Sequence, residues 1–131
     1  MLIFAALFAS ALGYFGYSIF APTGPIHRKT VEEFMQETGG LAPFPRSARS
    51  VRVFTPFLRF GSSATFSAPL PDIKEWIRQS PRMRGVIAEP IDGTSRTRYF
   101  HRDDRDGVLW TELVVDESNQ SVHVFVQGHA L

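Results

Sequence analysis

The chain opens with an unbroken apolar run. From Leu2 to Phe20 no side chain is charged, whereas charged residues recur throughout the rest of the sequence. Nineteen residues in an α-helix extend about 28 Å, which is close to the hydrocarbon thickness of a bilayer. The pattern therefore predicts one transmembrane helix over residues 1–20.

One ridge of this predicted helix consists of small residues. Ala5, Ala9 and Gly13 recur every four residues, and Gly16 follows three residues later. Small side chains at this spacing let two helix backbones approach closely in lipid, where packing rather than hydrophobicity drives association. We expect the ridge to pack against other transmembrane subunits. The alternative is that small residues are simply frequent in spanning helices.

A cleaved signal peptide is the main alternative for the whole segment. Such a peptide needs a basic start, an apolar stretch of about 7–15 residues and a small-x-small cleavage site. Here Leu2 follows Met1 directly, the apolar run is longer, and the match at Ala9–Ala11 falls inside it. The sequence therefore favours a retained anchor.

The basic residues nearest to the span predict its orientation. His27, Arg28 and Lys29 follow the span, and no Lys or Arg precedes it. Because basic residues flank spans on the cytoplasmic side, we expect an integral, single-pass membrane protein with a cytoplasmic C-terminal domain. The chain has no cysteine, which agrees with a reducing compartment but does not exclude others.

After the span, the pattern predicts a linker over residues 21–29 and one small domain over residues 30–131. The linker contains two prolines and a glycine, which disfavour a continuing helix. A capping box from Thr30 to Glu33 predicts a helix start, and the pair Gly39-Gly40 predicts its end. Apolar residues at helical spacing predict a second helix over Asp72–Gln79.

Several other stretches alternate apolar and polar residues, as half-buried strands do. The last three are joined by polar turns and predict an antiparallel meander. The first is interrupted by Pro56, which predicts either an edge strand or a strand that ends there. The fold class that follows is α+β, an antiparallel sheet with one or two helices on its apolar face. The predicted strands are Ser50–Leu58, Arg59–Ala68, Arg96–Arg102, Val108–Val115 and Ser121–Gly128, with an ambiguous short one at Val86–Ala88.

Charge is unevenly distributed, although the net charge is only +1. Between Arg46 and Arg84 there are eight basic residues against two acidic ones, and the balance reverses after Arg102. Arginine suits bidentate contacts with carboxylates and phosphates, so we expect contact with an acidic protein surface or anionic lipid. An ordinary solvated face is the alternative, and nucleic acid is not expected because no recognition motif accompanies the small net charge. The residues concerned are Arg46, Arg49, Arg52, Arg59, Arg78, Arg82 and Arg84.

Motifs for nucleophilic catalysis and nucleotide binding are missing from the sequence. The acidic run at 103–107 does not fit a calcium loop, since Arg102 and Leu113 occupy ligand positions. One set remains: His101, Glu112 and His123 lie on neighbouring predicted strands and would suit zinc or acid–base chemistry if they converged. The alternative is three polar residues on the solvated face of the sheet.

These patterns together predict a non-catalytic, single-pass accessory or docking subunit of a larger membrane protein complex, without a cofactor. Energy-converting respiratory or photosynthetic assemblies are one class that contains such small subunits. Two alternatives stay open. One is a membrane-anchored enzyme or metal-binding domain that uses His101, Glu112 and His123. The other is a module that binds anionic lipid surfaces.

Overall fold

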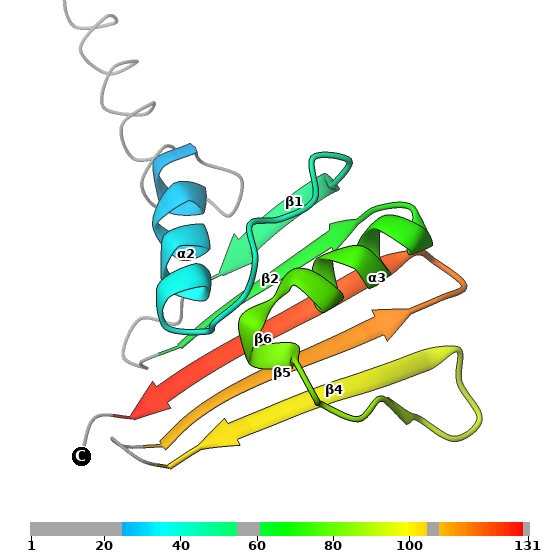
Figure 1. Ribbon diagram of the computed structural model, residues 1–131. Coiled ribbons are helices and arrows are strands. Elements are labelled where there is room, and N and C mark those ends of the chain that lie inside the picture. The colour runs from blue at the N-terminus through cyan, green and yellow to red at the C-terminus, as the bar shows by residue number, and fades with distance from the viewer. Residues whose placement is uncertain (1–24, 55–60, 105–107, 130–131) are drawn as a thin grey trace, which may run out of the picture.

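The computed structural model describes residues 25–54, 61–104 and 108–129, which form an α+β fold with a six-stranded antiparallel sheet and two α-helices (Figure 1). The predicted fold class is confirmed for this part of the chain. The predicted span, residues 1–20, lies outside it. Within the described residues, no helix is long and apolar enough to cross a membrane. In chain order the elements are α2 (Pro25–Glu37), β1 (Arg49–Phe54), β2 (Gly61–Ser67), α3 (Leu70–Gln79), the 3-10 helix η1 (Pro81–Met83), β3 (Glu89–Pro90), β4 (Arg96–Asp103), β5 (Val108–Asp116) and β6 (Ser121–His129).

The strands follow the spatial order β1-β2-β6-β5-β4-β3, and every neighbouring pair is antiparallel. The β4-β5-β6 meander is therefore as predicted, and β1 is an edge strand. β2 pairs with β1 on one side and with β6, which is distant in sequence, on the other, and this second pairing joins the N-terminal hairpin to the meander. The result places β5 and β6 in the middle of the sheet.

Both helices lie on the same face of the sheet (Figure 1). Val31 and Met35 of α2 are buried, as are Ile73, Trp76 and Ile77 of α3, at the helical spacing that the sequence predicts. They join one hydrophobic core with the alternate residues of the strands, since successive side chains of a strand point to opposite faces. The buried apolar residues from the sheet are Val51, Val53, Ala64, Phe66, Leu113, Val115, Val122, Val124 and Val126.

Aromatic packing fixes α3 on the sheet. The ring centroid of Trp76 lies 5.3 Å from that of Phe66, and the ring of Phe44 lies 5.0 Å from that of Phe66. Trp76 Nε1 donates a hydrogen bond to the carbonyl oxygen of Ala42, 2.9 Å away, and the Ser80 hydroxyl accepts one from the amide of Ala42. These bonds satisfy buried polar groups and tie the loop before β1 to α3.

Two local predictions are corrected by the structure. The first helix begins at Pro25 instead of Thr30, so residues 25–29 of the predicted linker are helical. Proline suits the first turn of a helix, where its missing N–H has no partner in any case, and an Arg28–Glu32 ion pair of 3.0 Å bridges one turn. The segment Val86–Ala88 is not a strand, and the short strand β3 follows it.

Candidate functional site

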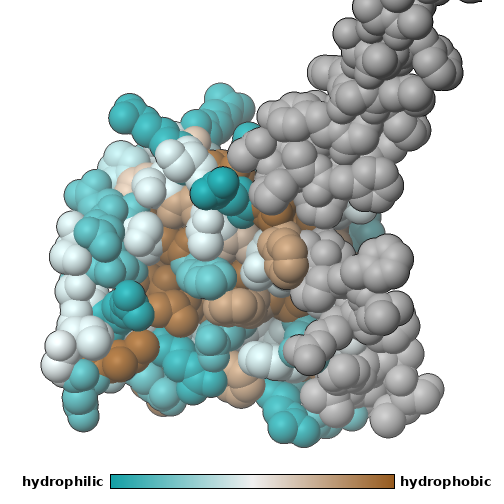
Figure 2. All heavy atoms as spheres, turned by 180° about the vertical axis from the view of Figure 1, so that it is seen from behind, coloured by the Kyte–Doolittle hydropathy of each residue, from teal (hydrophilic) through white to brown (hydrophobic). Residues whose placement is uncertain are grey.

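The face of the sheet opposite the helices is not covered by any element of the described residues, and we call it the open face (Figure 2). It carries the residues that alternate with the buried ones. Figure 2 shows apolar side chains on this face among hydrophilic ones that are more frequent toward its edges. The solvated face of an antiparallel sheet normally carries mainly polar residues, so the apolar side chains on the open face indicate a candidate contact surface.

Strand register brings aromatic residues together at one end of the open face. One row across the sheet contains, from β1 to β4, Phe54, Ser63, Phe125, Glu112 and Phe100. The next row toward the same end contains Gly61, Gln127, Trp110 and Arg102. We call Phe54, Phe100, Trp110 and Phe125 the aromatic end.

The aromatic end includes an open hollow of about 310 Å³. Phe54, Trp110 and Phe125 line it, together with the small residues Gly61 and Ser63. Phe54 is 58% exposed and lies with the other two rings around one hollow, so these residues form a patch rather than a single exposed apolar side chain. The hollow is therefore an accessible apolar surface rather than an internal cavity.

The opposite end of the open face is polar. A row there contains Ser67, Ser121, Asp116 and Arg96. Between the two ends lies a mixed row with Arg52, Thr65, His123, Val114 and Arg98. The face thus changes from aromatic to polar along the direction of the strands.

Arginines on β4 are paired with carboxylates. Arg98 Nε lies 2.7 Å from Glu112 Oε2, and its guanidinium carbon lies 4.5 Å from the ring centroid of Phe100. A second carboxylate, that of Glu89, lies 3.8 Å from Arg98. Arg102 pairs with Asp104 at 2.9 Å. These positive charges are therefore largely neutralised by neighbouring residues of the same domain.

His123 lies beside the aromatic end, and its ring stacks on Phe125 with centroids 4.1 Å apart. Partial burial lowers the pKa of His123, and the negative charge of Glu112 opposes that shift in part. Neutral imidazole is therefore the form favoured at neutral pH, and it adds a further aromatic surface to this region.

The predicted set of His101, Glu112 and His123 is not assembled. His101 is opposite Thr111, which is fully buried on the helix side, whereas Glu112 and His123 lie on the open face. His101 pairs with Thr111, the residue next to Glu112 on β5, and successive residues of a strand point to opposite faces, so His101 and Glu112 could share a face only in a different register. No group of three His, Cys, Asp or Glu side chains among the described residues could hold a metal ion.

The predicted arginine surface is also dispersed. Arg52 lies on the open face, whereas Arg78 lies on α3 and pairs with Glu75. Arg82 is half-buried, 3.8 Å from Asp103. Arg49 pairs with Ser67 at the polar end of the open face, Arg46 and Arg84 are exposed in a loop and a turn, and Arg59 lies outside the described residues.

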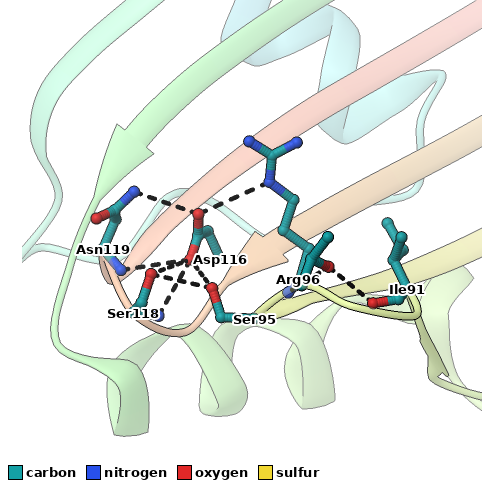
Figure 3. Close-up of polar contacts among 7 residues, drawn as sticks. Ile91, Ser95, Arg96, Asp116, Ser118 and Asn119 are labelled. Carbon is teal, nitrogen blue, oxygen red and sulfur yellow. Dashed lines mark hydrogen bonds and ion pairs between the residues drawn. The ribbon is translucent and has the colours of Figure 1, made fainter.

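Asp116, at the polar end of the open face, organises the turn between β5 and β6 (Figure 3). Its carboxylate accepts hydrogen bonds from the hydroxyls of Ser118 and Ser95, both at 2.7 Å, and from the side-chain amide of Asn119 at 3.2 Å. Hydrogen bonds from Ser118 and Ser95 lower the pKa of Asp116 to about 2. The turn is therefore a structural cluster that links the β5–β6 hairpin to the loop before β4.

This cluster predicts a specific pH dependence. The pKa of Asp116 is about 2 in the folded chain against an ordinary 3.8, so its ionised form stabilises the fold above about pH 4. That contribution is lost as the pH falls toward 2. Thermal unfolding in detergent compares the original full chain with Asp116→Asn. The original chain should be the more stable of the two at pH 5, and the difference between their unfolding temperatures should shrink steadily toward pH 2.

Ser118→Ala is the matched control, because it removes the largest cause of the lowered pKa and keeps the carboxylate. Its loss of stability on acidification should start near the same pH, because the pKa of the carboxyl group in the unfolded chain is unchanged, but the loss should be smaller and should end at a higher pH than in the original chain. Parallel stability curves for the original chain and Asp116→Asn would contradict the assignment.

The aromatic end was not among the predicted sites. Its only sequence signal is that Trp110 and Val114 share a strand face with Glu112, which leaves apolar residues on both faces of β5. Phe54 and Phe100 lie on strands that are far apart in sequence, so their proximity depends on the strand order. The chain matches no protein-family model and no curated protein sequence.

Proposed function

We propose that this protein is a non-catalytic, single-pass membrane accessory subunit whose small domain acts as a contact module. The observation that supports it most directly is the open face, where Arg98 and Arg102 are paired with carboxylates and the ring of Phe54 remains exposed beside other aromatic rings. Exposed aromatic rings are typical of contact surfaces, because they are enriched both at the centres of protein interfaces and at the headgroup level of membranes. The proposal places residues 1–20 in the membrane.

The proposed span positions the domain and supplies contacts with other subunits. Its small residues Ala5, Ala9, Gly13 and Gly16 would allow close packing against another transmembrane helix. Since α2 begins at Pro25, only residues 21–24 separate it from the span. The basic residues that follow the span place the domain on the cytoplasmic side in this proposal.

The dispersed arginines do not favour the alternative of a module attracted to anionic lipid. Arg52 and Arg78 lie on opposite sides of the sheet, and the charge of Arg78 is matched by Glu75. A lipid surface can approach only one side of the domain, so these residues would not act together. The role of accessory subunit is therefore better supported than recruitment of the domain by anionic lipid.

Membrane extraction tests the anchor directly. The full chain should stay with the membrane fraction after alkaline carbonate washing, whereas a chain without residues 2–20 should be released. The physical reason is that about 20 apolar residues in lipid resist extraction that removes surface-bound proteins. Release of the full chain, or terminal sequencing that finds those residues removed, would contradict the proposal.

The subunit role is tested by purification in mild detergent. The original chain should recover the same membrane protein reproducibly, and the double change Ala9→Leu and Gly13→Leu should lose it, because bulky residues separate the helix backbones. Leu12→Ile is the matched control and should keep the partner. Recovery of the original chain as a lone monomer would contradict a subunit role.

A further inference from the structure

We propose that the aromatic end of the open face contacts the interfacial region of the bilayer, with Phe54, Trp110 and Phe125 among the lipid headgroups and upper acyl chains. The inference rests on the proposed anchor, which holds the domain beside the membrane. It goes further by naming the surface of the domain that meets the lipid and the chemistry of the contact.

The length of chain before α2 brings this surface within reach of the membrane. Residues 21–24 extend at most about 14 Å, and the 13-residue α2 is about 20 Å long. Figure 1 shows α2 across the end of the sheet where β1 finishes and β2 starts. Phe54 and Gly61 are those terminal residues, so the hollow is at the end of the sheet nearest to the proposed tether.

The side chains at this end suit the interface between water and hydrocarbon. Trp110 has a large apolar ring and an N–H donor, the combination that concentrates tryptophan at the headgroup level of membranes. Phe54 is 58% exposed and borders the same hollow as Trp110 and Phe125. Transfer of these rings from water into the interfacial region removes apolar surface from water.

Charge pairing predicts how the contact depends on lipid composition. Arg98 is held by Glu112 and Glu89, and Arg102 is held by Asp104. Arg98 and Arg102 therefore have little net charge to offer to anionic headgroups. Arg52 is the exposed arginine of the row next to Phe54, and a single charge contributes little beside the aromatic rings, so the contact should persist on zwitterionic lipid. A protein partner could also bind an aromatic surface, but the bilayer is the apolar phase that the tether holds beside every copy of the domain.

Tryptophan fluorescence gives a direct test, because Trp76 and Trp110 are the only tryptophans in the chain. Trp76 is 2% exposed in the core, whereas Trp110 lines the hollow. The full chain is inserted into phosphatidylcholine nanodiscs with or without brominated acyl chains, which quench tryptophan on contact. We expect the loss of roughly half of the tryptophan emission if Trp110 lies at the interface, and no loss in Trp110→Phe.

Two surface variants provide a matched comparison. Phe54→Ser removes an exposed apolar ring from the aromatic end and should reduce the quenching of Trp110. Ile87→Ser removes an apolar side chain that is 81% exposed, close to the opposite edge of the sheet, and should leave the quenching unchanged. Equal quenching in both variants would overturn the assignment of the contact to the aromatic end.

Further outcomes separate this inference from the anchor and from other partners. Retention after carbonate washing without quenching would overturn the lipid contact alone and favour a protein partner for this face. Release by carbonate would overturn the anchor and the inference together. Quenching that requires phosphatidylserine and disappears at high salt would also overturn the inference, because it would show attraction by unpaired arginines.

Discussion

Replacement of Phe66 by alanine is expected to destabilise the domain by about 3–5 kcal/mol, the usual cost of removing a buried phenylalanine ring. Phe66 is 1% exposed on β2, and its ring packs against those of Phe44 and Trp76. The cavity would remove packing from the strand, the loop and α3 at the same time. Urea unfolding of the full chain in detergent, followed by far-UV circular dichroism, measures the change.

Phe54→Ala is the matched control, because it removes the same ring from the neighbouring strand at a position that is 58% exposed. Its expected cost is below about 1 kcal/mol, as for most surface substitutions. If the two substitutions lowered the free energy of unfolding by similar amounts, the assignment of Phe66 to the core and of Phe54 to the open face would be contradicted.

The second large effect is expected at Gly40. This residue follows the two turn residues, Thr38 and Gly39, that come directly after α2. Its φ of +64° lies in the left-handed region, and a Cβ atom there would lie 2.7 Å from Cβ of Arg82. The Gly40 carbonyl also accepts a hydrogen bond of 2.9 Å from the Arg82 amide, which restricts relaxation. Gly40→Ala should cost about 1–2 kcal/mol from backbone strain and about 1–3 kcal/mol from crowding.

Gly85 separates these two causes. Its φ of +76° is similar, but a Cβ atom there would have no neighbour within 4 Å. Gly85→Ala should therefore show only the backbone cost of about 1–2 kcal/mol. Both variants can be compared with the original chain by the same urea unfolding measurement. If Gly85→Ala destabilised as much as Gly40→Ala, crowding against Arg82 would be disproved.

Sequence periodicity predicted most of the elements because burial on one face leaves a local signal. The alternation through Leu113 and Val115, and the helical spacing of Ile73 and Trp76, correspond to buried positions in the structure. The start of α2 was misplaced because Thr30 carries a capping pattern inside a helix that begins earlier. Capping motifs are short, so neighbouring residues can override them.

The functional surfaces were harder to predict because they depend on pairing between distant strands. His101 and His123 are on strands that flank β5, as expected, but their side chains lie on opposite faces. A shift of one residue in register would reverse that result, and local sequence does not encode such a shift. The arginines between Arg46 and Arg84 likewise lie close in sequence but occupy a loop, a strand, a helix and a turn.

Neighbouring residues along the chain are enough to define the apolar run at its start, the α+β class and the periodic core positions. The position of β6 between β2 and β5, which brings Phe54 into one row with Phe125 and Phe100, follows from the folded sheet and not from local sequence. The folded sheet also decides that Arg98 is neutralised by Glu112. The physical reason is that strand order and register are set by packing of the whole sheet, whereas periodicity reports only the burial of each strand.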